Sequence, residues 1–341
     1  MNKLILGGLA AAAMTIQALP LAAAEYPKMT LRFAHIAPAR AYLSKVDTFF
    51  AEEVEKRSGG NIKIKIFWSN ALGSESEMID LIGSGAVDLG ALVTGYYFSR
   101  LPLAGMTNSL PATFYKGESV VKITRDLFEN DPAVKEELEK ANLRPILYRH
   151  LPEYRLICTK PVRTFADLKG KKVRTYGAYI PVMFKSFGAV PVNLMVGEVY
   201  ESLKRGTIDC SYFPYSILSL FKLYEAANYV MDANFGVINA FTIMTSRDNW
   251  NKKWPESVRK LMTEVAAEAE KMAFGLTATA EGAALENLKK NATLVHFEDQ
   301  DKIEAAGSKM FDVWVAKMEQ VGKGKEARRI VDYVGKQMKR P

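Results

Sequence analysis

Apolar and polar residues alternate with two different periods along the first hundred residues of the chain. Residues 62–66 alternate strictly between isoleucine and lysine, which predicts a strand with one covered face. In residues 41–56 the apolar side chains recur near helical spacing, which predicts an amphipathic helix. Residues 30–34 and the nearly continuous apolar run 87–93 are expected to be further strands, the second in a sheet buried on both faces. Strands that alternate with helices in this way indicate an α/β fold.

A second unit with the same order of elements follows after residue 170. Its expected strands are 172–175, 189–192 and 208–211, and its expected helices are 180–187 and 198–204. In each unit a helix is followed by a glycine, a spacer, a β-branched residue and an aspartate, at positions 85–88 and 206–209. Glycine favours the left-handed conformation that turns the chain out of a helix. Such a turn can recur by chance, but the shared flanking elements favour two similar lobes with a ligand cleft between them.

Three further signals concern helices. Ser74 and Glu77 form a capping-box pattern ahead of a helix that ends near residue 83. Residues 256–291 contain few helix breakers and predict a helix long enough to run along both lobes. Residues 301–320 are expected to form another helix that packs on a lobe.

The composition is that of an ordinary globular protein. Of the 341 residues, 48% are hydrophobic and 25% are charged. The net charge is +8, from 46 Lys and Arg against 38 Asp and Glu, and part of it lies in a basic tail at residues 323–340. We expect a solvated helix face there and no nucleic-acid partner, because no face combines concentrated positive charge with stacking aromatics. A mild positive balance suits a small anionic ligand.

The first residues predict an export signal. A positive start, residues 1–3, is followed by an apolar run, residues 4–13, and by three alanines at 22–24. This is the pattern of a Sec-type signal peptide cleaved after Ala24. A membrane anchor is the alternative, but the apolar run is short, and a glutamine and a proline interrupt the residues after it. We therefore expect a mature protein, residues 25–341, exported to the periplasm.

The cysteines and histidines suggest no metal site. Cys158 and Cys210 can form a disulfide in an exported protein, and two buried free thiols are the alternative that the sequence leaves open. His35, His150 and His296 lie far apart and lack the spacing of a metal motif.

The motifs of common enzymes are missing from the chain. Residues 83–85 resemble the start of a dinucleotide loop, but they end a helix and lead into a strand, the reverse of the required order. No Walker A, G-x-S-x-G or kinase motif occurs. We therefore expect no enzyme and no cofactor, although a secreted enzyme with a dispersed site that acts on a small acid is an alternative.

One segment carries a family resemblance. Residues 165–174, with the pattern Phe-x-Asp-Leu-Lys-Gly-x-Lys-Val-Arg, resemble the signature of the solute-binding proteins of TRAP (tripartite ATP-independent periplasmic) transporters. Further segments agree in order and spacing, namely 31–35, 72–78, 85–89, 197–203 and 208–209. The resemblance covers nearly the whole mature chain. It implies a periplasmic-binding-protein-like Venus flytrap, with two α/β lobes joined by crossing strands and a long helix.

The resemblance also implies lobe boundaries and a role. Lobe I is expected in residues 25–152 with about 239–278, and lobe II in residues 153–238 with about 300–330. Members of the family close on a carboxylate-bearing solute. The receptor, expected to be a monomer, then delivers the solute to a small and a large integral membrane protein. A ligand-sensing receptor for a signalling partner is an alternative role.

The resemblance assigns two arginines to the carboxylate. Arg174 matches the family arginine that pairs with the substrate carboxylate, and Arg155, ahead of a Lys-Pro turn, matches a second family arginine. A guanidinium binds a carboxylate through two charge-assisted hydrogen bonds, which lysine cannot reproduce. Without the resemblance, a surface ion pair would be the expectation for either residue.

The chain departs from the family pattern at residues 211–215. Phe213 stands where many members have an asparagine that binds the substrate. An aromatic wall favours an apolar or aromatic body behind one carboxylate, and it argues against a sugar acid, a short dicarboxylate or a bound metal. Packing in the core of a lobe is the alternative for the tyrosines. The remaining predicted binding residues are Tyr96, Tyr154, Tyr176, Tyr215, Glu75, His35 and Asn239.

Overall fold

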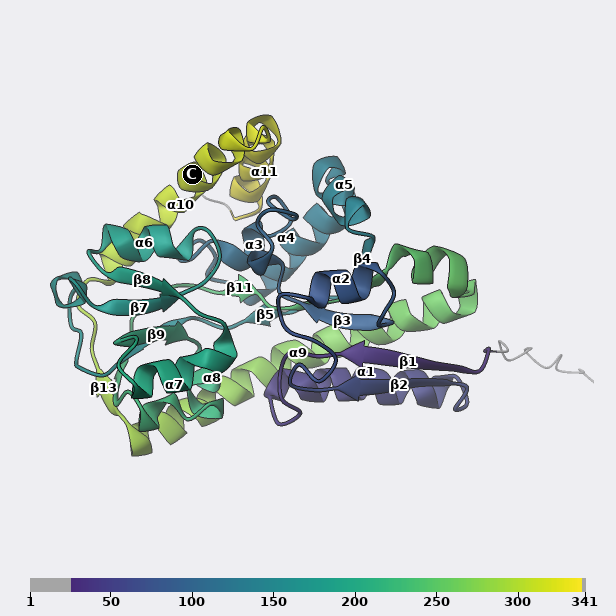
Figure 1. Cartoon of the computed structure of the whole chain (residues 1–341), viewed down its shortest axis with the longest axis horizontal. Coiled ribbons are helices and arrows are strands. Elements are labelled where there is room, and N and C mark those ends of the chain that lie inside the picture. Colours follow the sequence, from purple (N-terminus) through teal and green to yellow (C-terminus); the bar gives the residue numbers. More distant parts are fainter. Residues whose placement is uncertain (1–25, 339–341) are drawn as a thin grey trace, which may run out of the picture.

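Two β-sheets with helices packed on them lie side by side in the chain (Figure 1). The structure is a computed structural model that describes residues 26–338. The expected signal peptide, its cleavage site and the last residues of the basic tail lie outside the described residues.

The first sheet has five strands in the order β2-β1-β3-β12-β4. Its strands are β1 (Met29–Ala34), β2 (Ile62–Phe67), β3 (Leu89–Leu92), β4 (Leu143–Leu147) and β12 (Thr242–Ser246). Its helices are α1 (Tyr42–Arg57), α2 (Met78–Gly83), α3 (Met106–Ser109), α4 (Gly117–Asn130) and α5 (Pro132–Lys140). In α1 the side chains of Val46, Phe50 and Val54 recur every four residues and are fully buried, so the amphipathic pattern is explained by packing in the core.

The second sheet has six strands in the order β13-β10-β6-β9-β7-β8. Its strands are β6 (Arg155–Cys158), β7 (Lys172–Thr175), β8 (Val190–Asn193), β9 (Cys210–Phe213), β10 (Tyr229–Met231) and β13 (Thr293–Val295). The helices of this part are α6 (Ile180–Ser186), α7 (Val199–Lys204) and α8 (Tyr215–Leu220). Because β7 lies between β8 and β9 and is parallel to both, its position is fixed from two sides.

The repeated glycine–aspartate motif has the same role in both sheets. The glycines that open the two motifs have φ angles of 73° and 70°, the left-handed conformation expected there. Asp88 Oδ2 accepts a hydrogen bond from the backbone N of Arg32 at 2.8 Å, and Asp209 Oδ2 accepts one from the backbone N of Lys172 at 2.7 Å. Each aspartate thereby ties the start of its own strand to a neighbouring strand. The sequence repeat is therefore also a structural repeat.

Three expectations need correction. β3 and β9 each begin two residues later than expected, at Leu89 and Cys210, because the aspartate side chain replaces a backbone carbonyl in the first bond between the strands. Ser74 does hydrogen-bond Glu77, with Oγ donating at 2.6 Å, but α2 begins only at Met78. The pair therefore closes a turn before the helix and does not cap it.

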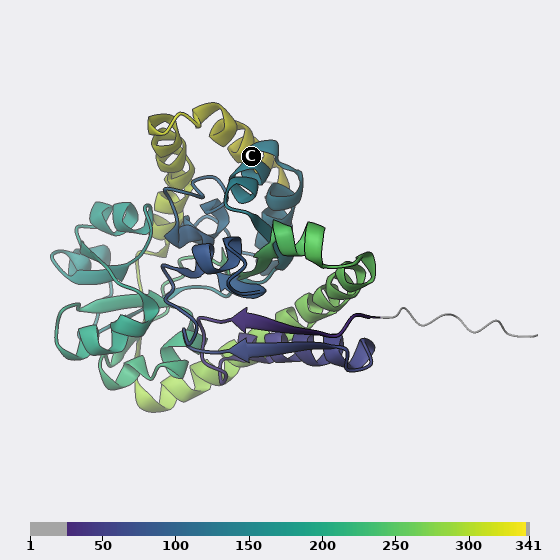
Figure 2. The same cartoon turned by 45° about the vertical axis from the view of Figure 1, so that its right-hand side comes forward.

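Two connections join the lobes. A two-stranded sheet is formed by β5 (His150–Leu151) and β11 (Ile238–Asn239), which are antiparallel. The 36-residue helix α9 (Glu256–Asn291) has the expected bounds and contacts α1 and β4 of the first lobe and α8 of the second. Figure 2 shows it running as one continuous helix along both parts. The crossing strands and the long helix of the expected fold are thus both present.

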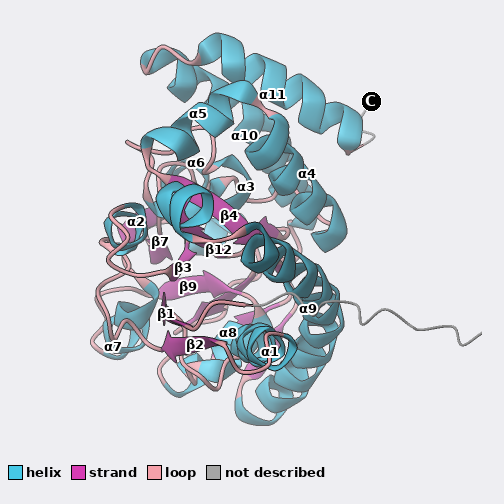
Figure 3. Cartoon of the chain, turned by 90° about the vertical axis from the view of Figure 1, so that its right-hand side faces the viewer, coloured by secondary structure: helices cyan, strands magenta, loops and turns pink. Residues whose placement is uncertain are grey.

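The last two helices lie over both lobes. They are α10 (Gln300–Gln320) and α11 (Gly324–Gln337). α10 begins beside the second sheet, where Asp299 Oδ2 accepts a hydrogen bond from the backbone N of Phe165 at 2.8 Å. α11 packs on α4 (Figure 3). Arg329 of α11 also pairs with Asp131, the residue that precedes α5. Residues 300–330, which we expected in lobe II, therefore also belong to the packing of the first lobe.

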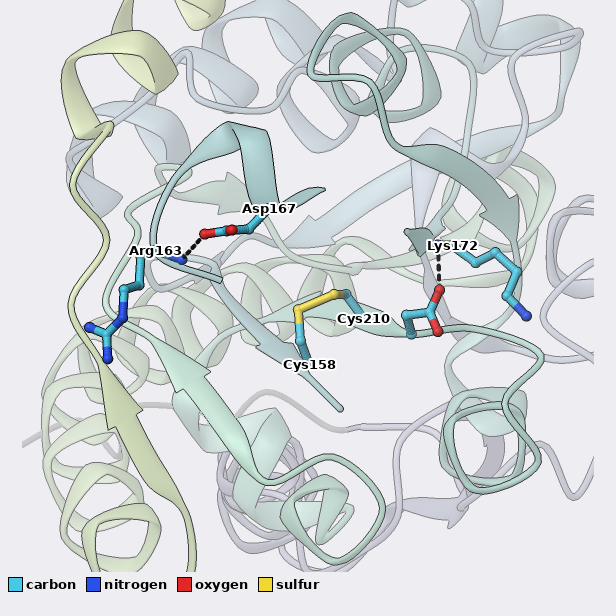
Figure 4. The surroundings of a disulfide bond; sticks show 6 residues. Cys158, Arg163, Asp167, Lys172 and Cys210 are labelled. Carbon is cyan, nitrogen blue, oxygen red and sulfur yellow. Dashed lines mark hydrogen bonds between the residues drawn. A yellow bond between two sulfur atoms is a disulfide. The ribbon is translucent and has the colours of Figure 1, made fainter. Parts of the chain in front are cut away.

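Cys158 and Cys210 form a disulfide, which settles the question that the sequence left open. They are directly paired residues of the antiparallel strands β6 and β9 (Figure 4). Within residues 26–338, none of the helices has the length and apolar character needed to cross a membrane.

Candidate ligand-binding site

A cavity of about 340 Å³ lies between the two lobes. The first lobe contributes the segment between β1 and α1, and the second contributes parts of β7, β9 and α8. The long helix α9 contributes Ala280, Ala283 and Ala284, whose small side chains leave space beside the helix. A cavity of this volume is in the usual range for a small-molecule site.

The side chain of Arg174 is buried in this cavity with its hydrogen-bonding capacity partly unused. Its Nε donates to the carbonyl oxygen of Leu194 at 3.0 Å. Neither terminal nitrogen has a hydrogen-bond partner within residues 26–338, and Arg174 is only 1% exposed. A buried cation without a counter-ion is unfavourable. The guanidinium therefore offers two unused donors to an anion that enters the cavity.

Aromatic rings surround this guanidinium. Cζ of Arg174 lies 4.5 Å from the ring centroid of Phe213 and 4.8 Å from that of Tyr176. Tyr96 packs edge to face on Tyr176, with centroids 5.4 Å apart, and the buried Tyr154 also lines the cavity. Burial raises the pKa of Tyr96 to about 12, although the charge of Arg174 opposes this rise. The phenol of Tyr96 is therefore neutral at pH 7.

The family-like segment at residues 165–174 explains how Arg174 reaches the cavity. Asp167 Oδ2 accepts hydrogen bonds from the backbone N of Arg163 at 2.8 Å and of Thr164 at 3.1 Å, and so closes a short helical turn (Figure 4). Gly170 then adopts a φ of 76°, and the chain turns directly into β7. The turn residues of the motif thus determine where the strand that carries Arg174 begins.

Asn108 connects the two sides of the cavity. Its Nδ2 donates to the carbonyl oxygen of Asn239 at 2.7 Å, and its Oδ1 accepts from the backbone N of Gly95 at 3.1 Å. Tyr176 Oη, from the second lobe, donates to the carbonyl oxygen of Asn108 at 3.1 Å. The two lobes are therefore in direct contact beside Arg174.

Arg155 and Tyr215 lie together but outside the residues that line the cavity. Cζ of Arg155 is 5.2 Å from the ring centroid of Tyr215, and its Nη1 donates to the carbonyl oxygen of Asp232 at 2.9 Å. The guanidinium of Arg155 is thus held by neighbours in its own lobe, and the structure does not bring it to Arg174.

His35 is part of a fully buried charge network and does not line the cavity. Its Nδ1 accepts from the backbone N of Ala37 at 3.0 Å, and its Nε2 lies 2.9 Å from Asp47 Oδ2. Asp47 also accepts two hydrogen bonds from Arg149, at 2.8 and 3.1 Å. Burial would raise the pKa of Asp47, but Arg149 and His35 outweigh it and lower the pKa. Through Ala37, His35 positions the lining segment between β1 and α1.

Glu75 and Asn239 are buried near the cavity without lining it. Glu75 is 6% exposed, and its Oε2 has no hydrogen-bond partner in the described part of the chain. Burial raises the pKa of Glu75, although the charge of Arg174 opposes this. Asn239 Nδ2 donates to the carbonyl oxygen of Ala240 at 2.9 Å, so this side chain supports β11.

Sequence reasoning missed the cavity-lining residues of the helices α1, α3, α8 and α9, with Asn108 on α3. Tyr42 of α1, Ser216 of α8 and the alanines of α9 lie in amphipathic stretches with no unusual motif. The spacing of Ala280, Ala283 and Ala284 places small residues on one face of α9, and this was the one available signal.

Comparison with known proteins identifies the family. The family model described as bacterial extracellular solute-binding protein, family 7, matches residues 33–320. A solute-binding protein of Roseobacter denitrificans is 26% identical over 269 residues, which are 78% of this chain and 81% of that protein. The C4-dicarboxylate-binding protein DctB of Bacillus subtilis is 26% identical over 293 residues, which are 84% and 81% of the two chains.

Solved structures show the same fold. A TRAP periplasmic solute-binding protein from Desulfovibrio salexigens, with bound orotic acid, has a TM-score of 0.79 at 19% identity, covering 91% of this chain and 99% of that one. The extracytoplasmic solute receptor DctP7 of Bordetella pertussis, which binds pyroglutamic acid, has a TM-score of 0.78 at 20% identity, covering 90% and 99%. The expected two-lobe α/β fold is confirmed. Because the family model covers most of the chain, the chain belongs to family 7 of the bacterial extracellular solute-binding proteins, the extracytoplasmic receptors of TRAP transporters.

Proposed function

We propose that this receptor captures a monocarboxylate with an apolar or aromatic body and delivers it to the membrane complex of a TRAP transporter. The observation that carries the proposal is the buried guanidinium of Arg174, with two unused donors inside the cavity. A ligand carboxylate accepts both hydrogen bonds and supplies the negative charge that the buried cation lacks. Lysine would supply the charge without the paired donors.

The cavity is poorly suited to a second carboxylate. Among its described lining residues, Arg40 is the one cation besides Arg174, and Arg40 is exposed. A second carboxylate would lose its hydration without gaining a buried partner of opposite charge. Phe213, Tyr176 and Tyr154 instead offer aromatic surface to an apolar ligand body.

The ligands of two structural neighbours support the single carboxylate of the proposed ligand. One was solved with orotic acid and another binds pyroglutamic acid, and each of these acids carries a single carboxyl group on a ring. Neighbours with bound galacturonate or glucuronate take more polar acids, for which Phe213 offers no hydrogen bond. The name of the Bacillus subtilis relative refers to C4-dicarboxylates, which the single buried cation of this cavity disfavours.

The remaining parts of the proposal concern how the receptor works. The protein is exported through a signal peptide cleaved after Ala24, acts as a monomer without catalytic turnover, and presents its ligand to a small and a large membrane subunit. The family match to extracellular receptors and the export pattern of residues 1–24 support this.

Mass spectrometry of the ligand released from purified protein, combined with a thermal-shift screen, tests the proposed ligand class. A ligand that binds only the folded state raises its apparent stability. We expect 3-phenylpropionate and similar monocarboxylates to raise the melting temperature more than succinate or galacturonate does. Strong stabilisation by succinate or galacturonate alone, or release of a dicarboxylate, would overturn the proposal.

A further inference from the structure

Two loops, one from each lobe, meet beside the cavity. Residues 94–98 come after β3 in the first lobe, and residues 176–179 lie between β7 and α6 in the second. A Cβ atom added at Gly177 would lie 3.0 Å from the carbonyl oxygen of Gly95, closer than the 3.4 Å at which ordinary van der Waals contact begins. The two backbones therefore touch, and a side chain at position 177 would push them apart.

Two further contacts join the same parts of the lobes. Tyr176 Oη donates a hydrogen bond to the carbonyl oxygen of Asn108 on α3 at 3.1 Å. The ring of Phe98 packs edge to face on that of Tyr179, with centroids 6.0 Å apart. Each contact pairs a residue of the first lobe with a residue of the second. We call the three contacts together the latch, namely Gly95 with Gly177, Asn108 with Tyr176, and Phe98 with Tyr179.

Most of the latch lies outside the surface that a ligand contacts. Among the described residues that line the cavity around Arg174, the latch contributes Asn108 and Tyr176 only. Phe98 and Gly177 instead line a separate cavity of about 460 Å³, and Tyr176 borders both cavities. A change at Phe98 or Gly177 can therefore alter the contact between the lobes without removing a contact to the ligand.

We infer that the latch determines how tightly the receptor retains its acid, through contacts between the lobes that the acid does not touch. Arg174 is only 1% exposed, so an acid leaves it only when the segments around the cavity separate. The latch contacts exist only while the lobes are together, and they stabilise the state that holds the acid. Apparent affinity falls in proportion to the fraction of protein in that state. The inference rests on the proposed function only in that an acid binds between the lobes.

Gly177→Ala, compared with Gly206→Ala, isolates the contact between the lobes. Both glycines belong to the second lobe and have left-handed φ angles, 64° and 70°, so alanine strains the backbone similarly at both positions. A Cβ atom added at Gly206 would have no neighbour within 4 Å, whereas at Gly177 it would meet the other lobe. The backbone strain is therefore common to the two variants, and the obstacle to closure is present in one.

Calorimetric titration with 3-phenylpropionate, succinate and galacturonate gives the readout. We expect Gly177→Ala to raise the dissociation constant of every acid that wild type binds by the same factor, about tenfold, because overpacking at the contact opposes closure. Gly206→Ala should bind like wild type. Equal affinities in the two variants, or a loss confined to one of several bound acids, would overturn the latch.

Phe98→Ala keeps the inference testable if Gly177→Ala does not fold. Phe98 is half-buried and contacts the other lobe, whereas the half-buried Phe187 contacts Phe165 and Phe184 of its own lobe. We expect Phe98→Ala to weaken all bound acids by a common factor of about two to ten, and Phe187→Ala to leave their affinities unchanged. Normal affinity in Phe98→Ala would then overturn the latch. Preferential binding of succinate by wild type would contradict the proposed ligand class and leave the latch standing.

Discussion

Phe213, which departs from the family pattern, contacts Arg174, which matches that pattern. The aromatic ring stacks over the guanidinium and reduces the space for water around the expected carboxylate. We therefore expect the side chain at position 213 to affect which ligand the cavity binds.

Replacing Phe213 with asparagine should change ligand selectivity as well as stability, because this ring is buried in the core cluster. Removing the buried ring costs about 1.5–3 kcal/mol of apolar contact. We therefore expect Phe213→Asn to bind 3-phenylpropionate at least tenfold more weakly and to lose its preference over galacturonate, as measured by calorimetry. Tyr212→Phe, the neighbouring change on β9 outside the cavity lining, is the matched control. Unchanged selectivity in Phe213→Asn would assign this ring to the lobe core only.

The predicted site residues form two groups, those that line the cavity and those that lie near it. Arg174 and Phe213 lie on neighbouring strands, and both line the cavity together with the tyrosines at 96, 154 and 176. Arg155, His35 and the other predicted residues are near it, but their side chains are used in contacts within the protein. Sequence position indicates that a residue is close to the cleft, whereas the direction of a long or buried side chain depends on neighbours from distant parts of the chain.

At the scale of elements, amphipathic periods and turn residues predict most of the strands and helices. The helix at 256–291 has its expected ends, because Pro255 precedes it and few breakers interrupt it. The insertion of β12 (Thr242–Ser246) between β3 and β4 could not be predicted, since it joins strands that are far apart in the sequence. The packing of α11 on α4 of the first lobe could not be predicted for the same reason.

The disulfide between β6 and β9 should stabilise the second sheet. It closes a loop over a sequence separation of 52 residues, and the loss of chain entropy in the unfolded state corresponds to about 4 kcal/mol. We expect the double variant Cys158→Ala and Cys210→Ala to lose roughly 2–4 kcal/mol of unfolding free energy in urea titrations. Equal stability of the wild type with and without reductant would show that the bond contributes nothing.

His150, on the crossing strand β5, should make the free energy of unfolding depend on pH. Burial lowers the pKa of His150 on β5 from 6.5 to about 4, and its ring stacks on Phe274 of α9 with centroids 5.1 Å apart. As pH falls from 6.5 towards 4, the unfolded chain binds a proton that the folded chain does not, so stability decreases. The loss should approach about 3 kcal/mol, and it should be absent above pH 7.

Urea unfolding of wild type and His150→Gln at a series of pH values measures this effect. The unfolding free energy of wild type, relative to that of His150→Gln, should fall steadily as the pH is lowered from 6.5 to 4.5. Carboxylates that titrate below pH 5 affect both proteins alike and cancel in the difference. A constant difference over this range would place the pH dependence elsewhere.

At the scale of the whole molecule, the cavity lies between two lobes that are joined by β5, β11 and α9. The hydrogen bond from Tyr176 Oη to Asn108 O joins the lobes beside the cavity and would break on opening. Hinge closure around a ligand is an established type of motion in two-lobe receptors. We expect small-angle scattering to give a smaller radius of gyration with ligand than without it. An identical envelope at saturation would contradict the two-lobe closing mechanism.

The most direct test of the account is calorimetric titration of Arg174 variants with the acid released from wild-type protein. Loss of one partner from a buried charge pair costs about 2–5 kcal/mol. Arg174→Ala should therefore raise the dissociation constant roughly 30-fold to a few thousandfold, and Arg174→Lys should recover little of the loss. Arg155→Ala should remain near wild type, because its guanidinium lies outside the cavity lining. Near-normal affinity in a folded Arg174→Ala, with loss of binding in Arg155→Ala, would contradict the account and place the carboxylate anchor elsewhere.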